Sequence, residues 1–478
     1  MVEGENLYST METWKMKGQL QKRLVKPQKT IGGESKRNLD GSTNSVTHPT
    51  SRKEHTIDNT TELMEQLVAR PNMLLAYKKV KSNKGSPGID KISTEDLKDY
   101  LKENWEQIKE QLLRGDYQPQ PVRRVEIPKP NGGVRKLGIP TVIDRLIQQS
   151  IHQILSPIFE LTFSVNSYGF RPNRSAAQAI KRAKNYIREG RRWVIDMDLE
   201  KFFDKVNHDI LMERIRRKVK DPRILTLIRR YLKAGIMENG IVKVNEEGTP
   251  QGGPLSPLLS NIMLTDLDKE LERRGHAFCR YADDCNIYVY SEKAGHRVLK
   301  SITQFVEKKL RLKVNREKSD VGRPWQRKFL GFSFTSLKKT TIRVHEKSRK
   351  TIQTKVKELC RIGKGMNLET FIKKKLNPVL RGWGNYFKIA EAKSFVKGLD
   401  AWIRRRLRVL QWRIWVRVRT KYKKLAARGV DPQKAYMMAN SSKGPWRMSG
   451  FLTMTEAFPY TYFEEHGLIS LFQIFRGR

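Results

Sequence analysis

The sequence contains few cysteines, and their spacing excludes a disulfide framework or a structural zinc module. Only Cys279, Cys285 and Cys360 occur among the 478 residues. This is an odd number, without the Cys-x-x-Cys spacing that zinc modules use. Cys279 and Cys285 flank a pair of aspartates, but Mg²⁺ prefers oxygen to sulfur, so we interpret both thiols as ordinary core residues.

The sequence also has no long apolar run. No stretch approaches the roughly 20 residues that a membrane-spanning helix needs. The polar N-terminal stretch lacks the apolar centre of a signal peptide. These two absences predict a cytoplasmic protein without a membrane partner.

Acidic residues are scarce relative to basic ones. The chain has 95 Lys and Arg residues but only 50 Asp and Glu residues, which gives a formal net charge of +45. No fold requires such an excess, so the charge describes the partners, and a nucleic acid is the polyanion that fits it best. Because 38% of the residues are hydrophobic, the chain can also build several packed cores.

The first 60 residues differ from the rest in having few apolar positions. Lys, Ser, Thr, Asn and Gly predominate there, and such a segment cannot bury enough apolar surface to order itself. We therefore expect a disordered basic arm over residues 1–60, with organised structure beginning at Thr61.

Two adjacent carboxylates in a strand-like stretch are the most informative feature that is present. Asp283 and Asp284 lie between Phe278 and Tyr290, a run that is rich in β-branched and aromatic residues and has no Gly or Pro. A carboxylate pair in apolar surroundings repels itself and loses hydration, so a cation normally compensates. Taken alone, an Asp-Asp dipeptide is more often a solvated turn.

A further carboxylate lies in a second strand-like run, from Trp193 to Leu199. Alternation puts Asp196 and Asp198 on the same face of this run, and spacing alone does not choose between them. A hairpin tip with two aspartates, set against this strand, is the arrangement that two-metal phosphoryl transfer needs. Short carboxylate ligands indicate Mg²⁺.

Two other segments offer groups for a nucleotide. Residues 123–140 form two extended runs around a Gly-rich turn, which predicts a β-hairpin with Lys129 and Arg135 near its tip. These cations suit phosphates, although a solvated charged hairpin is the plainer interpretation. The Gly- and Pro-rich loop over 248–257 would let backbone approach a ligand, with Gln251 offering its amide.

Apolar periodicity predicts several helices. They cover residues 141–158, 175–188, 208–233 and 258–270, and an earlier helical stretch is interrupted by Pro71.

Short blocks of sequence, in this order, resemble those of bacterial group II intron reverse transcriptase/maturases. They are Asn83–Asp90, Ile127–Pro130, Ser167–Arg174, Asp198–Asp204, Thr249–Gly253, Tyr281–Asp284, Leu312–Asn315 with Lys318, and Phe329–Phe332. Any one block is weak, but their common order and their span from about residue 60 onward make the resemblance specific. Arg381–Phe387 is similar to the signature of the family's maturase domain.

The resemblance implies an α+β fold. It predicts a right-hand polymerase, with fingers and an antiparallel palm sheet over residues 61–335. An α-helical thumb, also called domain X or the maturase domain, would follow over 336–425, and a basic DNA-binding-like tail over 426–478. The chain lacks the paired cysteines and histidines of the HNH endonuclease that some relatives carry, so it resembles the shorter, class C type in the bacterial cytosol.

The resemblance also implies roles for individual residues. Asp198, rather than Asp196, matches the family's catalytic position and would join Asp283 and Asp284 in holding two Mg²⁺ ions, which Mn²⁺ could replace. The main-chain carbonyl of Leu199 would be a further ligand. Phe203 would lie under the nucleotide sugar, where its bulk would exclude a 2′-hydroxyl. The residues expected to contact the nucleotide are Lys129, Arg135, Phe203, Gln251 and Lys318.

The region Trp402–Lys424 is typical of one very basic helix with interleaved aromatics. Its apolar residues could form core while its arginines face solvent. The net charge favours contact with nucleic acid instead. The arginines expected to make it are Arg404, Arg405, Arg406 and Arg408.

Two classes of function are compatible with this sequence. One is an RNA-directed DNA polymerase that extends a DNA primer or target on an RNA template with dNTPs, and assists splicing and retrohoming of its group II intron RNA. The other is an RNA-binding maturase that acts mainly as a splicing cofactor. A host-domesticated reverse transcriptase, used in defence or repair, is a variant of the first. The presence of all three aspartates favours an enzyme, and the sequence gives no indication of oligomeric state.

Overall fold

The computed structural model describes residues 60–128, 134–238, 241–243, 248, 252–337, 339–363 and 365–477. Residues 1–59 of the predicted basic arm, Lys129 and Gln251 lie outside these ranges, as does the side chain of Arg135. Within the described ranges, no helix is both long enough and apolar enough to cross a membrane.

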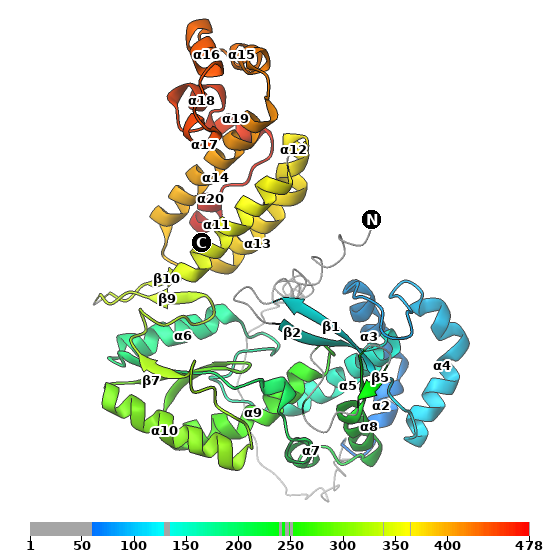
Figure 1. Ribbon diagram of the computed structural model, residues 1–478. Helices are drawn as coiled ribbons and strands as arrows, with labels where there is room; N and C mark the ends of the chain where they lie inside the picture. Colours follow the sequence, from blue (N-terminus) through cyan, green and yellow to red (C-terminus); the bar gives the residue numbers. More distant parts are fainter. Residues whose placement is uncertain are drawn as a thin grey trace, which may run out of the picture. The chain divides into compact units, whose positions relative to one another are not determined.

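The chain forms two compact units, each assembled from separate stretches of sequence. The first comprises the residues up to Ser164 together with Leu199–Asp268 and Phe305–Lys313. The second comprises Val165–Asp198, Lys269–Gln304 and the residues from Val314 onward. Both units contain helices and strands, which confirms the predicted α+β class (Figure 1).

The first unit contains a four-stranded sheet in the order β2-β1-β4-β5. Its strands are β1 (Val122–Pro128), β2 (Val134–Ile139), β4 (Ile236–Glu238) and β5 (Ile241–Lys243). β1 and β2 pair antiparallel, which confirms the predicted hairpin, whereas β1 and β4 pair parallel. The helices are α2 (Leu63–Val68), α3 (Arg70–Ser82), α4 (Leu97–Arg114), α5 (Val142–Glu160), α7 (His208–Arg216), α8 (Pro222–Lys233) and most of α9 (Ser256–Arg273).

Local signals set where these helices begin. α5 starts after Thr141, whose side chain accepts a hydrogen bond from the Asp144 amide. Pro71 occupies the first turn of α3, where the amide proton that proline lacks has no helical partner to lose. The predicted interruption at Pro71 is therefore the start of a helix.

The prediction of one helix over 208–233 is wrong, because the chain forms α7 and α8 there. Asp221 caps α8, with its side chain accepting from the Arg223 amide, and Pro222 is the first residue of the helix. Asp221 also accepts a hydrogen bond from the Met64 amide at 3.0 Å. Buried Asp221 thus starts a new helix at this point and links α8 to α2.

The second unit contains an antiparallel sheet in the order β6-β7-β3-β8. Its strands are β3 (Trp193–Met197), β6 (Ala277–Tyr281), β7 (Asp284–Val289) and β8 (Asp320–Gly322), flanked by α6 (Ala176–Arg188) and α10 (Glu292–Lys309). All neighbouring strands pair antiparallel, which confirms the predicted palm sheet. Cys279 is fully buried, with its thiol 3.6 Å from the Ala179 carbonyl of α6, and is a core residue as interpreted.

A two-stranded ribbon and a helical region follow in the second unit (Figure 1). The ribbon pairs β9 (Phe332–Phe334) with β10 (Ile342–Val344). The helices are α11 (Glu346–Ile362), α12 (Leu368–Phe371), the π-helical η3 (Ile372–Leu376), α13 (Asn377–Phe387), α14 (Lys393–Ile414), α15 (Val418–Ala426), α16 (Pro432–Ala439), α17 (Pro445–Met448), α18 (Leu452–Ala457), α19 (Tyr460–Glu465) and α20 (Leu471–Arg476). They confirm the predicted helical character of the C-terminal part.

The prediction of a single helix over Trp402–Lys424 is wrong. α14 ends at Ile414 and α15 begins at Val418. Between them, buried Trp415 leaves the helical conformation and stacks on Phe458, with the ring centroids 5.6 Å apart. The packing of one aromatic side chain therefore overrides the local helical pattern.

Candidate active site

The two adjacent aspartates lie at the tip of the hairpin formed by β6 and β7. The ladder closes with Tyr281 opposite Asp284, so Ala282 and Asp283 form a two-residue turn. Ala282 has a φ of +58°, a left-handed conformation that residues other than glycine adopt mainly where the surroundings enforce it. The hairpin predicted around the aspartates is present.

The register of the sheet sets Asp198 opposite the same tip. β3 pairs with β7 up to Met197 opposite Cys285. Continuing that register by one step brings Asp198 opposite Asp284, and directly opposite residues have Cβ atoms about 4.5–5.5 Å apart on one face of a sheet. Asp198 therefore follows the end of β3 at the same end of the sheet as the Asp283–Asp284 pair, and both Asp283 and Asp198 act electrostatically on Asp284.

Asp196 occupies a different position on the same face. It pairs with Asn286 on β7 and with Asp320 on β8, one pleat repeat away from the hairpin tip. Loss of hydration raises the pKa of Asp196 to about 6; Arg327 opposes the rise, and Asp198 adds to it. Asp196 therefore contributes negative charge from within the sheet, not from its end.

A short loop holds the backbone and the side chain of Asp198. Its amide donates to the Ser319 hydroxyl at 2.9 Å, and its carbonyl accepts from the Asn315 amide at 2.9 Å. The Lys318 Nζ lies 3.6 Å from Asp198 Oδ2. Both charged side chains are partly exposed, so the pair adds little stability, but it places a cation beside a carboxylate of the site.

The carboxylates at the tip repel one another. Loss of hydration raises the pKa of Asp284 to about 7. Its neighbours that add to the rise are, in decreasing order, Asp283, Asp196 and Asp198, while Lys328 opposes it. Asp284 is exposed to solvent, so the loss of hydration is incomplete and the repulsion from the neighbouring carboxylates, which a cation could relieve, matters more.

The chemistry of this donor set fits a hard divalent cation. All of the candidate ligand atoms at the tip are carboxylate oxygens, which Mg²⁺ prefers. Among the described residues, no three His, Cys, Asp or Glu side chains already converge into a group that could hold a metal ion. The aspartates would therefore have to turn toward a shared ion, a change of rotamer that partly exposed side chains can make.

Residues behind the tip fix its backbone, and sequence reasoning assigned them no role. Arg280 is fully buried, and its Nη1 donates to the Ala282 carbonyl at 2.9 Å. The Tyr168 amide donates to the Arg280 carbonyl at 2.9 Å. A Cβ on Gly169 would stand 2.3 Å from the Ala282 nitrogen, so only glycine allows this approach. The contacts of Tyr168 and Gly169 join residues far apart in sequence, so no local pattern reveals them.

Two of the predicted site residues, Leu199 and Phe203, belong to the first unit. Leu199 is buried. Phe203 is half-buried in the 3₁₀ turn η2 (Phe202–Asp204), with its ring centroid 5.2 Å from that of Phe202. A Cβ on Gly248, which has a φ of +91°, would stand 2.6 Å from the Phe203 carbonyl oxygen. The turn that carries Phe203 is thus packed closely against Gly248.

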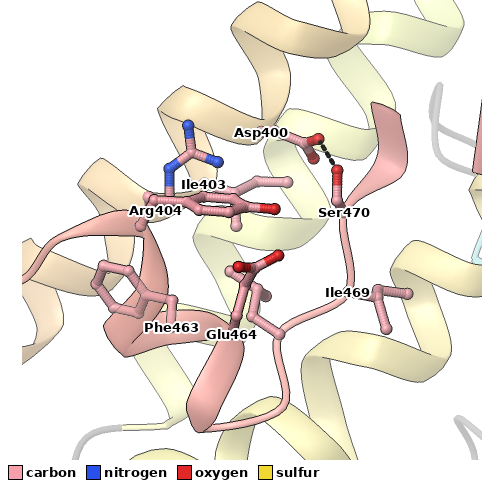
Figure 2. Close-up of a pocket in the computed structure, with 9 residues that line it drawn as sticks. Asp400, Ile403, Arg404, Phe463, Glu464, Ile469 and Ser470 are labelled. Atoms are coloured by element: carbon pink, nitrogen blue, oxygen red, sulfur yellow. Dashed lines mark hydrogen bonds between the residues drawn. The ribbon is translucent and has the colours of Figure 1, made fainter. Parts of the chain in front are cut away.

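The arginines of α14 make contacts inside the second unit. Arg404 lies over the Tyr460 ring at 5.0 Å from its centroid. It lines a small pocket near Asp400, whose carboxylate accepts a hydrogen bond from the Ser470 hydroxyl at 2.9 Å (Figure 2). Asp400 also accepts from the Leu471 amide at 3.1 Å, so this region ties α14 to α20.

The next arginines on α14 hold the segment that carries α17 and α18. Arg405 lies 4.0 Å from the Trp446 ring centroid and donates to the Trp446 carbonyl at 3.0 Å. Arg406 lies 4.5 Å from the same ring. Arg408 donates to the Phe458 carbonyl at 3.0 Å. These side chains have structural contacts whether or not they also meet nucleic acid.

Two parts of the chain match known protein families. Residues 127–334 match the reverse transcriptase (RNA-dependent DNA polymerase) family. Residues 349–429 match the maturase-specific domain of group II introns. The three aspartates fall in the first match, and the arginines of α14 fall in the second.

Known proteins extend this similarity. Protein YkfC of Escherichia coli is 35% identical over 297 residues, which are 54% of this chain and 78% of that protein. The group II intron-encoded protein LtrA of Lactococcus lactis is 40% identical over 215 residues, 45% of this chain but only 36% of LtrA. One chain of a solved structure, a partial Cas6-RT-Cas1–Cas2 complex, is 26% identical with a TM-score of 0.35. The match covers 52% of this protein and 42% of that chain. That score is too low to bear on the fold.

Proposed function

The chain belongs to the family of group II intron-encoded reverse transcriptases with a maturase domain, and we propose that Asp198, Asp283 and Asp284 carry its RNA-directed DNA polymerase reaction. The observation that supports this most is the β3–β7 register, which ends at Met197 opposite Cys285, so that Asp198 and Asp284 each follow directly at the end of the sheet where the hairpin tip bears Asp283. The raised pKa of Asp284 adds support, because mutually repelling carboxylates at a fixed place are expected where a cation binds.

The three carboxylates, with the main-chain carbonyl of Leu199, would hold two divalent ions, Mg²⁺ or Mn²⁺. When bound, such ions supply the Lewis acidity that favours deprotonation of a primer 3′-hydroxyl and neutralises the leaving pyrophosphate. The protein's own contribution is placement, since Arg280 holds the turn from behind and Ser319 holds the backbone of Asp198. Protons compete with cations at Asp284, so binding of an ion should strengthen as the pH rises.

We extend the proposal to the incoming dNTP. The half-buried ring of Phe203, supported by Phe202, would lie under the sugar and exclude a 2′-hydroxyl. Lys318, beside Asp198, would contact a phosphate. The remaining nucleotide contacts, which rest on the family pattern alone, are Lys129, Arg135 and Gln251.

Membership of this family implies binding to intron RNA and to other nucleic-acid substrates. We propose that the helical region assists splicing and retrohoming of a group II intron, because residues 349–429 match a maturase-specific domain. Domain bounds at 61–335, 336–425 and 426–478 remain part of the proposal.

Primer extension on an RNA template tests the catalytic assignment. Asp283→Ala removes a metal-binding carboxylate and should lower cDNA synthesis by roughly 100-fold or more, while binding of intron RNA stays close to wild type. Asp198→Asn should behave in the same way. Asp196→Asn is the matched control, because it removes a charge from the same face one pleat repeat away and should retain measurable extension.

Two results would contradict this assignment. Substantial cDNA synthesis by Asp283→Ala would overturn the role of the hairpin tip. A larger loss with Asp196→Asn than with Asp198→Asn would move the third carboxylate one pleat repeat into the sheet.

A further inference from the structure

Arginines and aromatic rings alternate at the end of the antiparallel sheet that lies opposite the hairpin tip. The guanidinium carbon of Arg323 lies 3.9 Å from the Trp193 ring centroid and 5.4 Å from that of Trp325. The guanidinium carbon of Arg192 lies 5.1 Å from the Trp325 centroid. These four residues, which all belong to the second unit, form what we call the arginine–tryptophan edge.

The strand register explains why these residues meet. Trp193 opens β3 at the end of the sheet where β7 finishes. Val194 pairs with Gly322 on β8, so Arg323 comes next to Trp193 directly after that strand. Because a strand advances by about 3.3 Å per residue, Asp198 lies roughly 15 Å further along the direction of β3. The edge is thus a surface separate from the candidate active site.

Two guanidinium groups of this edge keep their charge and most of their hydrogen-bonding capacity. Arg192 donates to the Ser336 carbonyl, and Arg323 donates to the Arg192 carbonyl at 3.3 Å. Within the described ranges, each makes only this hydrogen bond and neither forms an ion pair, whereas neighbouring Arg191 pairs with Glu189. A guanidinium has five N–H donors, so most of those on Arg192 and Arg323 remain available to a ligand.

The rings at this end of the sheet are accessible. Trp193 and Trp325 are half-buried, and Arg192 beside them is exposed. Tyr290, which directly follows β7, is 64% exposed, and Arg191 lies 5.0 Å from its ring centroid. A planar guanidinium can stack on a ring and still donate to a phosphate through its edge, and accessible rings accept unpaired bases. This combination suits a single-stranded polynucleotide.

We infer that the arginine–tryptophan edge is a binding surface for a single-stranded segment of RNA. Bases would stack on the accessible parts of the indoles, and Arg192 and Arg323 would bind phosphates. The formal net charge of +45 favours such a polyanion over a protein as the occupant. The inference rests on the RNA binding that family membership implies, and it does not require the assignment of the three aspartates.

Photo-crosslinking of the full chain locates the bound RNA. Two RNAs with 4-thiouridine in unpaired segments serve as probes: a group II intron RNA, and the template strand of a primer–template. Mass spectrometry of the crosslinked peptides should place at least one of these RNAs on residues 192–193 or 323–325. The RNA that crosslinks there identifies whether the segment belongs to the intron or to the template.

Arg192→Gln tests the phosphate contact, since the side chain is exposed and its loss opens no core cavity. For the RNA that crosslinks, the slope of log affinity against log salt should fall by about 0.7, with a roughly 4-fold loss of affinity near about 0.15 M salt. The Tm should stay near wild type. Arg192→Lys keeps the charge and should restore the slope. Arg297→Gln is the matched control, because Arg297 is exposed on α10 and, within the described ranges, has no ring contact or ion pair.

The inference is wrong if neither RNA labels the arginine–tryptophan edge. An unchanged salt slope for Arg192→Gln also overturns it, and a lower Tm in the same variant would then show that the edge only caps the sheet. Asp283→Ala separates this failure from that of the proposed function, because its crosslinks at the edge should match those of the wild type. If Asp283→Ala extends primers normally while the edge is labelled, only the catalytic assignment fails.

Discussion

At the scale of single residues, the candidate site brings together carboxylates that repel one another. Asp284 lies beside Asp283, and Asp196 and Asp198 also add to the rise in its pKa. Sites of catalysis commonly keep such unfavourable electrostatics because they serve a bound cation.

The pH dependence of stability should reveal this repulsion. The pKa of Asp284 is about 7 in the folded chain and about 4 for an unperturbed Asp. The folded state thus binds the Asp284 proton more tightly than the unfolded state does. The stability gained from this protonation is fully present below pH about 4 and is lost as the pH rises through 7. Without divalent ions, the free energy of unfolding of Asp284→Asn at pH 8 should exceed that of the wild type by on the order of 1 kcal/mol. This figure allows for the solvent that reaches the carboxylate.

Thermal unfolding in a chelating buffer at pH 5 and pH 8 measures this effect. The difference in Tm between Asp284→Asn and the wild type should be larger at pH 8 than at pH 5. A gap that is equal at both values would mean that the carboxylate is not under the strain inferred from its neighbours.

At the scale of elements, the arginines of α14 hold the C-terminal helices. Arg405 combines a ring contact with Trp446 and hydrogen bonds to the Trp446 carbonyl and the Ser449 hydroxyl. Arg413 is exposed on the same helix. Substituting each of the two residues therefore distinguishes an arginine that supports the fold from an exposed arginine that is available to nucleic acid.

Arg405→Ala should lower the free energy of unfolding by about 1–3 kcal/mol, because the ring contact and the hydrogen bonds are lost together. Arg413→Ala should leave the Tm near wild type. Comparing Tm with RNA affinity for both variants provides the check. A Tm for Arg405→Ala equal to that of Arg413→Ala would show that the contacts of Arg405 do not support the fold.

Elements whose signals are local could be predicted from the sequence. Alternation around Asp196 predicts β3, and the residues flanking Asp283 predict the hairpin. Long-range packing was not predictable: Trp415 breaks a continuous helical pattern because it stacks on Phe458. The contact of Tyr386 with Leu330 joins positions 56 residues apart, and no periodicity signals such a pair.

At the scale of the whole molecule, the part of the polymerase match that lies in the second unit shares one hydrophobic core with the maturase match. A single buried cluster includes Val194 and Tyr288 from the carboxylate-bearing sheet, and it continues through Val356 to Phe475 in the helical region. The predicted boundary between residues 335 and 336 crosses this core. The carboxylate-bearing sheet and the helices that follow it therefore support each other.

The central claim is that the aspartates at the hairpin tip bind divalent ions, and Mn²⁺ binding followed by electron paramagnetic resonance tests it most directly. With a non-extendable primer on an RNA template and a dNTP, Asp284→Asn should bind Mn²⁺ roughly 10-fold or more weakly than the wild type. Asp196→Asn should remain near the wild type. Equal Mn²⁺ binding by Asp284→Asn and the wild type would contradict the account.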